Sequence, residues 1–145
     1  MDRREFAALV PALLACGALT PAEGQTNLPV LESGTFKPGP PGSGSEPKRV
    51  SRKYTMGMLK AGNIRLEMHE TTQEVGAPHE PVGTHLHSEI WLVREGTVEL
   101  TTNGVARRMV AGDVGICVAG DKHFIANVGD TPATYFVVTV GPPEP

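Results

Sequence analysis

Two histidines and a glutamate lie close together in residues 83–89, which read Gly-Thr-His-Leu-His-Ser-Glu. The imidazole nitrogens of His85 and His87 and the carboxylate of Glu89 suit a borderline divalent metal such as Fe(II), Mn, Ni, Co or Zn. In an extended strand, residues at i, i+2 and i+4 share one face, so the three side chains could converge on one ion. A chance surface cluster has the same composition, and this segment alone does not decide between the two.

The chain around this segment is patterned for short strands separated by turns. Asn103-Gly104 is a strong hairpin sequence, because a type I′ turn needs positive φ at both central positions. No segment from residue 52 onward has a convincing helical pattern, and no repeat is present. Eight or nine strands fit an all-β fold, a small antiparallel jelly roll or barrel. The strands are expected at residues 54–59, 63–72, 90–95, 98–102, 105–110, 114–118, 123–128 and 133–140.

The alternation within residues 63–72 also assigns the faces of one strand. Ile64, Leu66 and Met68 fall on one side and His69 on the other, so His69 is expected to be exposed rather than a ligand. Residues 76–81 form a turn or loop, and their His79 is expected to be a solvated loop histidine.

Length and charge limit the class of protein. A chain of 145 residues with 17 glycines, 13 prolines and a net charge of −3 forms one turn-rich domain without a nucleic-acid partner. The one short basic run is interpreted as a solvated patch. It comprises Lys48, Arg49, Arg52 and Lys53.

Residues 1–22 have the features of an export signal rather than of a folded element. A charged start precedes an apolar run, residues 7–19, that is too short to span a bilayer and has the length of a signal core. Arg3-Arg4-x-Phe6 resembles the twin-arginine export signal, and cleavage after Ala22 would deliver a periplasmic or secreted protein. The alternative is a lipoprotein box at residues 13–16, which would leave a lipid anchor on Cys16.

Two further features concern the segment after the signal and the cysteines. Residues 23–50 are interpreted as a Pro/Gly-rich linker, extended or mobile, or as an arm that docks on the domain at residues 51–143. After cleavage Cys117 would be the sole cysteine, which excludes an intrachain disulfide, and its apolar neighbours indicate a buried strand residue.

Residues 112–127 contain a second motif, and it favours a metal site over a chance cluster at residues 83–89. They resemble the second signature of the cupin family, with glycines at 112 and 120, His123 and Asn127 at the family spacing, and Val118 where proline is usual. The first segment resembles the other cupin signature, in which six residues separate Glu89 from Gly96. The resemblance extends over residues 52–141 and identifies the chain as similar to a small single-domain cupin, with a jelly-roll barrel.

The resemblance also implies a metal site. In cupins two histidines and the glutamate of the first signature and one histidine of the second hold the metal, and Glu89 and His123 match by position. Counting back from Glu89 without a gap, His85 takes the second histidine's place and Gly83 stands where the first belongs. The alternative keeps His85 and His87 as the pair and shortens the turn before Glu89. The expected ligands are therefore His85, His87, Glu89 and His123, with His87 a ligand in one register and a turn or rim residue in the other.

A cupin of this kind implies a function at the metal. We expect an exported metal-dependent enzyme that acts on a small organic substrate, of dioxygenase, isomerase or decarboxylase type. The alternatives are a non-catalytic metal- or small-molecule-binding cupin and a cupin with a degenerate site. Trp91 and Val93 share the face of Glu89 and would wall the pocket, whereas Asn127 would fix strand geometry. Family resemblance further implies a homodimer that covers exposed strand edges.

Overall fold

The computed structural model describes residues 27–43 and 46–144. In this part of the chain nine β-strands and no helix occur, so none of the described residues forms a helix that could cross a membrane. Every strand except β1 corresponds to a segment that the sequence predicted. The strands are β1 (Gly42–Ser43), β2 (Arg49–Met58), β3 (Arg65–Gln73), β4 (Ser88–Glu95), β5 (Thr97–Thr102), β6 (Val105–Val110), β7 (Val114–Cys117), β8 (His123–Asn127) and β9 (Ala133–Gly141).

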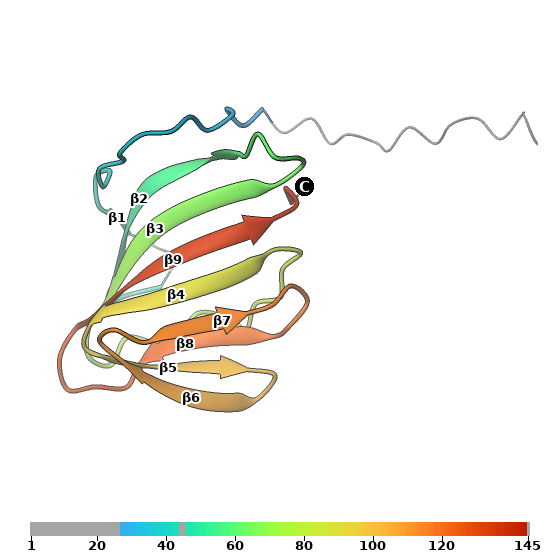
Figure 1. The fold of residues 1–145 in the computed structure, drawn as a ribbon. Coiled ribbons are helices and arrows are strands. Elements are labelled where there is room, and N and C mark those ends of the chain that lie inside the picture. The colour runs from blue at the N-terminus through green and yellow to red at the C-terminus, as the bar shows by residue number, and fades with distance from the viewer. Residues whose placement is uncertain (1–26, 44–45, 145) are drawn as a thin grey trace, which may run out of the picture.

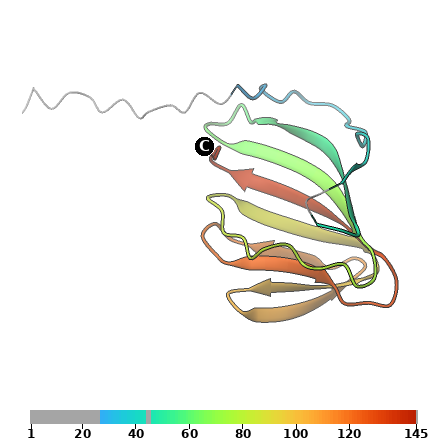
Figure 2. The ribbon, with the colours of Figure 1, turned by 180° about the vertical axis from the view of Figure 1, so that it is seen from behind.

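The strands form two antiparallel sheets. The larger sheet has the order β1-β2-β3-β9-β4-β7 and the smaller sheet the order β6-β5-β8. Both sheets curve in the same sense, and β5, β6 and β8 lie across from the inner face of the larger sheet (Figures 1 and 2). This arrangement confirms the predicted all-β antiparallel class.

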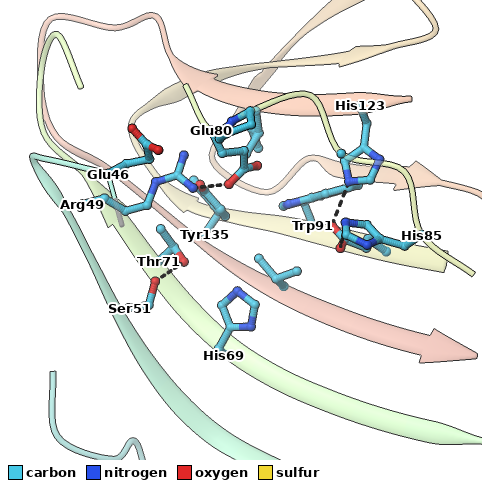
Figure 3. A pocket seen from close by; sticks show the side chains of 15 residues that line it. Glu46, Arg49, Ser51, His69, Thr71, Glu80, His85, Trp91, His123 and Tyr135 are labelled. Carbon is cyan, nitrogen blue, oxygen red and sulfur yellow. Dashed lines mark hydrogen bonds and ion pairs between the residues drawn. The ribbon is translucent and has the colours of Figure 1, made fainter. Parts of the chain in front are cut away.

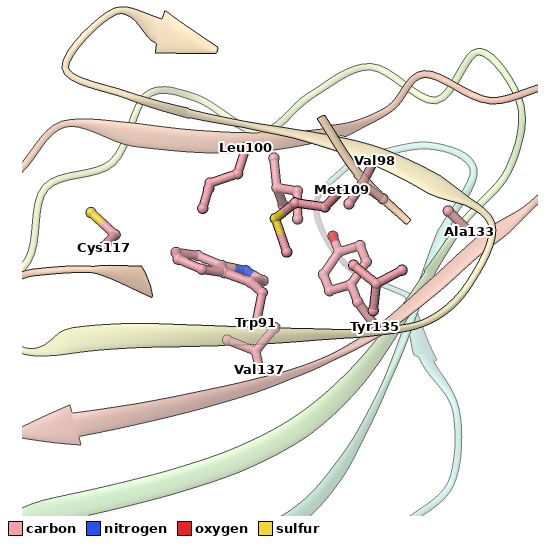
Figure 4. Close-up of a cluster of buried hydrophobic side chains, with 10 residues drawn as sticks. Trp91, Val98, Leu100, Met109, Cys117, Ala133, Tyr135 and Val137 are labelled. Carbon is pink, nitrogen blue, oxygen red and sulfur yellow. The ribbon is translucent and has the colours of Figure 1, made fainter. Parts of the chain in front are cut away.

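A hydrophobic core joins the two sheets (Figure 4). Trp91 and Val93 are each 1% exposed, which confirms their predicted inward direction from β4. Alternate residues of facing strands interdigitate at such an interface, because side chains of a strand point to opposite faces. The core comprises Trp91, Val93, Val98, Leu100, Met109, Cys117, Ile125, Ala133, Tyr135 and Val137.

The Asn103-Gly104 hairpin between β5 and β6 also positions β8. Asn103 has φ 48° and Gly104 has φ 79°, as the predicted type I′ turn requires. The Asn103 side chain accepts a hydrogen bond from the Lys122 backbone N–H at 3.0 Å, and the Asn103 N–H donates to the Lys122 carbonyl at 2.8 Å. This turn therefore fixes the entry into β8, whose first residue is His123.

The N-terminal arm is docked on β2 over the residues that the structure describes. The Leu31 N–H donates to the Met58 carbonyl and the Met58 N–H to the Pro29 carbonyl, each at 2.8 Å. Gly57 allows this approach, because a Cβ there would lie 2.5 Å from the Pro29 oxygen. Further along, β1 pairs with β2 through Gly42 and Ser51. The contacts of the arm with β2 thus lie at residues 29–31, 39 and 42–43. The predicted export signal lies outside the described residues.

Candidate metal centre and its cavity

Strand β4 places Glu89 on the inner face of the larger sheet. Glu89 pairs with Thr139 of β9 and with Cys117 of β7, and Thr139 pairs with Glu67 of β3. Residues in register across neighbouring strands point to the same face. Glu89 therefore lies in a row of side chains that faces the interior, one pleat before Trp91.

Three histidines surround the Glu89 carboxylate. His123 Nε2 lies 3.3 Å from Oε2, while His87 Nε2 and His85 Nε2 lie 3.1 Å and 3.8 Å from Oε1. His85 and His87 precede β4 and stack at a centroid distance of 4.6 Å, whereas His123 comes from β8 of the facing sheet (Figure 3). The structure thus brings together all four residues that the sequence singled out.

The spacing of these donor atoms fits a transition metal. Two ligand atoms that each lie about 2.1 Å from one metal are roughly 3.0 to 3.4 Å apart at octahedral or tetrahedral angles. Both Glu89–histidine contacts below 3.5 Å fall in this range, and the ligand atoms of His85, His87 and Glu89 all lie within 4.8 Å of one another. Imidazole nitrogens with one carboxylate suit Fe, Mn, Ni, Co or Zn.

Gly83 faces the same site. It forms a two-hydrogen-bond bridge with His123, and each N–H donates to the other's carbonyl at 2.9 Å. A Cβ on Gly83 would lie 3.0 Å from His85 Nε2 and 3.7 Å from His123 Nε2. The first register places a histidine at this position, and a Cβ there would already be tight against His85.

His87 is part of the cluster around Glu89. Its side chain is 9% exposed, and its Nε2 approaches the same Glu89 oxygen as His85 Nε2. Gly141 makes room for it, because a Cβ there would lie 2.7 Å from the His87 Cβ. His87 lies in a bend directly before β4, as the turn position of one register requires, and it is buried beside Glu89. Whether it ligates a metal stays a prediction.

Glu144, near the C-terminus, contacts the outer side of two histidines. Its Oε1 accepts a hydrogen bond from the Leu86 N–H at 2.6 Å and lies 3.0 Å from His87 Nδ1, while Oε2 lies 3.7 Å from His85 Nδ1. The His87 contact lacks hydrogen-bond angles, since Nδ1 has no hydrogen-bond partner among the described residues. Partial burial works against ionisation, but the Leu86 N–H and the two histidines outweigh it and lower the pKa of Glu144.

His123 has its own positioning partners. Its Nδ1 lies 3.2 Å from the Asp121 carbonyl and 3.2 Å from Cys117 Sγ. An N–H at Nδ1 donating to this carbonyl leaves the Nε2 lone pair directed toward Glu89, as metal-ligating histidines require. Burial raises the pKa of the Cys117 thiol, and the charges of Asp121 and Glu89 raise it further. Cys117 is thus a buried, protonated neighbour of His123, as its apolar surroundings predicted.

A cavity of about 340 Å³ extends from these residues between the sheets (Figure 3). His85 and His123 lie at one end, Arg49, Glu80 and Tyr135 at the other (Figure 3). Such a volume is at the small end of ligand pockets. Its lining comprises Glu46, Arg49, Ser51, His69, Thr71, Glu80, Pro81, Gly83, His85, Glu89, Trp91, His123, Ile125, Tyr135 and Val137.

On its outer side, His85 also lines a second, shallow hollow on the surface. Thr84, Leu86, Gly120 and Glu144 complete that hollow. His85 therefore separates the inner cavity from the surface of the protein.

The polar face of β3 points into the cavity rather than into solvent. His69 lines the cavity with its side chain 25% exposed, which corrects its predicted exposure. Glu67 is 13% exposed, forms an ion pair with Arg65 and lies 3.6 Å from both His69 Nδ1 and Lys53 Nζ. The interaction with His69, followed by those with Lys53 and Arg65, outweighs burial and lowers the pKa of Glu67 from 4.5 to about 2.

Arg49 is not part of a solvated basic patch, contrary to the prediction. Its side chain is 9% exposed and pairs through Nη1 with Glu80, whereas Lys48, Arg52 and Lys53 are exposed. The run of four basic residues hid the alternation of β2, which turns Arg49 and Ser51 toward the cavity. That alternation is the signal that could have separated Arg49 from its neighbours.

Two other residues have the positions that the sequence indicated. Asn127 is a structural residue, because its Nδ2 donates to the Gln73 and Thr131 carbonyls and its Oδ1 accepts from the Gly129 N–H. His79 is exposed on its loop and stacks on Phe124 at 4.2 Å.

Comparison with protein families gives a match to the cupin domain over residues 69–139. The matched residues include both segments that were predicted to hold a metal. Comparison with curated proteins gives no match.

Solved structures show the same fold. KdgF from Halomonas sp. aligns with a TM-score of 0.57 at 16% identity, over 70% of this chain and 87% of that one. An RmlC-like cupin from Shewanella frigidimarina aligns at 0.56 and 18%, over 75% and 86% of the two chains. The Cnp3 cupin domain of Schizosaccharomyces pombe aligns at 0.53 and 17% over 63% of this chain, which spans 64% of that one. These likenesses confirm the predicted cupin jelly roll.

Proposed function

We propose that this protein is a metal-dependent cupin enzyme that acts on a small organic molecule. The observation that carries the proposal is the convergence of three histidines on the carboxylate of Glu89 at one end of a cavity. We assign His85, His87, Glu89 and His123 to a divalent transition metal. When bound, such a metal supplies Lewis-acid or oxygen-activating chemistry to a substrate beside it.

The protein's own residues would orient the ligands and shape the substrate side. The Glu144 carboxylate lies on the Nδ1 side of His87 and His85, and the Asp121 carbonyl lies on that of His123, while each Nε2 faces Glu89. Gly83 leaves the cavity side of the centre without a side chain, and a substrate could reach the metal there. Trp91, which packs edge-on against His123 at 5.5 Å, gives that side an apolar wall.

His69 is the residue best placed to move a proton on the substrate. It lines the cavity beside the metal centre, one pleat along from the row of Glu89, and it contacts Glu67. A histidine held by a carboxylate can accept or return a proton during a reaction. The reactions that we propose for this site are those of the dioxygenase, isomerase or decarboxylase type.

Metal content is the test of the centre. Untagged protein is expected to carry about one divalent transition metal per chain, since neutral imidazoles and a carboxylate bind such ions at neutral pH. The variants Glu89→Gln and His123→Ala should lose most of the metal, and His79→Ala should retain it because this exposed histidine lies outside the centre. Elemental analysis of the four proteins provides the comparison.

Equal and negligible metal content in wild type and His123→Ala would refute the proposal of a metal-dependent enzyme. The remaining alternative would then be a cupin with a degenerate site. Metal without turnover in an oxygen-uptake and product screen against phenolics, diketones and sugars would leave a non-catalytic binding protein. Gly83 is a residue that favours the degenerate site, because it stands where the first register places a histidine ligand.

We also propose that the protein is exported to the periplasm or secreted after cleavage near Ala22. The proposal depends on the sequence of residues 1–22. Fractionation of cells that produce the full chain, beside an Arg3→Lys, Arg4→Lys variant, tests it. Mature protein outside the cytoplasm that disappears in the variant is the expected result.

A further inference from the structure

The end of the cavity opposite the histidines carries a buried cation with free donors. The Arg49 side chain is 9% exposed, and its Nε and Nη2 have no hydrogen-bond partner among the residues that the structure describes. Only Nη1 is engaged, in the ion pair with Glu80. A buried polar group without a partner is costly, and functional sites are where such groups are retained.

The two free nitrogens define the shape of the missing partner. Nε and Nη2 form one edge of the planar guanidinium, with two nearly parallel N–H groups. This edge matches the two oxygens of a carboxylate, which it binds through paired charge-assisted hydrogen bonds. No ion pair joins Arg49 to Glu46, the other carboxylate at this end of the cavity (Figure 3).

Tyr135 adds a further donor to the same end. It lines the cavity, and its hydroxyl oxygen accepts a hydrogen bond from Gln73 Nε2 at 2.7 Å. Its own O–H is therefore available to a ligand. Burial raises the pKa of Tyr135, so this hydroxyl stays protonated at neutral pH.

We propose that the substrate is a small organic acid whose carboxylate binds the Nε/Nη2 edge of Arg49, with the Tyr135 hydroxyl beside it. The rest of the molecule then extends along the cavity toward the centre at Glu89. This inference rests on the proposed function, because it names the substrate class of the same cavity.

Titration calorimetry with acids and their amides tests the proposal on the metal-loaded wild type. The probes are lactate against lactamide and benzoate against benzamide, and the single tryptophan, Trp91, gives a fluorescence readout from the cavity wall. At least one acid should bind at least about tenfold more tightly than its amide, because only the acid forms the charge-assisted pair. Equal binding of acids and amides, or no binding of either acid, would overturn the proposal.

Three variants locate the contact. Arg49→Lys retains the charge beside Glu80 but not the paired donors, so acid binding should weaken at least about tenfold, and Arg49→Gln should weaken it further. Arg52→Gln removes an exposed charge from the same strand and should change nothing. Undiminished acid binding by folded Arg49→Lys and Arg49→Gln would refute the assignment.

Metal content separates the two proposals. Both Arg49 variants should retain the wild-type metal, because Arg49 lies at the far end of the cavity (Figure 3). Arg49-dependent acid binding by a protein that never holds metal would refute the proposed function and leave this inference standing.

Discussion

Glu144 contacts His85 and His87 from outside the cavity. It follows β9, whereas the two histidines precede β4. A carboxylate on the Nδ1 side of a ligating histidine fixes the ring and increases the basicity of Nε2. We therefore propose that Glu144 positions the two histidines in the proposed centre. A lone glutamate after two prolines gave no sequence pattern that pointed to this contact.

Replacing Glu144 should weaken metal binding without removing a ligand. We expect Glu144→Gln to lower metal affinity roughly 10- to 100-fold, because the amide keeps the shape but loses the charge. Competition with a chelator of known affinity measures the change, and Glu74→Gln, on an exposed residue, is the control. Unchanged affinity in Glu144→Gln would show that this carboxylate has no role at the centre.

Glu67 should make the stability of the protein depend on acidic pH. Its pKa is lowered from 4.5 to about 2, so the folded state favours the charged form. The stabilisation is present above pH 4.5 and is lost as the pH falls toward 2. Solvent screening limits it to about 1 kcal/mol.

Urea unfolding of wild type and Glu67→Gln at a series of pH values measures this effect. The difference in the free energy of unfolding should be largest near neutral pH and vanish near pH 2. A difference that is the same at pH 6 and pH 2.5 would contradict the lowered pKa of Glu67.

Strand β2 links the N-terminal arm to the cavity. The arm pairs with the outer edge of β2 at Met58 and at Ser51. The first residue of β2 is Arg49, which lines the cavity. Alternation and turns predicted β2 to β9, because side-chain periodicity is visible in a sequence. The sequence did not decide whether the arm docks or is a linker. The arm is held by backbone hydrogen bonds to an edge strand, and such bonds produce no side-chain periodicity in the sequence.

Gly57 is where the docking of the arm can be tested. A Cβ there would lie 2.5 Å from the Pro29 oxygen and 2.7 Å from a Leu31 methyl, so Gly57→Ala should force the arm away and cost about 1–3 kcal/mol. Gly42→Ala is the matched control, because its Cβ would lie 3.8 Å from its neighbour. Thermal unfolding and limited proteolysis of residues 27–43 are the measurements. Equal stability of both variants would mean that this close approach does not contribute.

At the scale of the molecule, the outer face of the larger sheet carries an apolar patch. Leu92 of β4 pairs with Val114 of β7, and the two are 44% and 57% exposed, while Ile116 is 60% exposed. The arm covers the β2 edge, which leaves the β7 edge as the open one of this sheet. The homodimer expected by family resemblance is therefore proposed to form at β7.

Light scattering on size-fractionated protein tests this dimer. Wild type should be dimeric, and Ile116→Glu should shift it to monomer, because a buried charge at the contact is costly. Val105→Glu, on the exposed hairpin, should remain dimeric. A monomeric wild type would contradict the proposed dimer. A dimeric Ile116→Glu variant would show that the dimer contact does not include Ile116.

The candidate site shows what sequence could and could not supply. His85, Glu89 and His123 followed from the resemblance of residues 83–96 and 112–127 to the two cupin signatures. Arg49, Glu80 and Glu144 did not, since their relevance depends on which segments meet in space. Metal binding by the four predicted ligands stays a prediction.

His85 stands between the inner cavity and a shallow hollow on the surface. An ion in the proposed centre, beside this partly exposed side chain, would exchange with the surrounding solution while the fold stays closed. The identity of the bound metal would then be set by the supply in the compartment where the mature protein resides, and not by the ion present when the chain folds. On this view the same polypeptide could hold different metals before and after export.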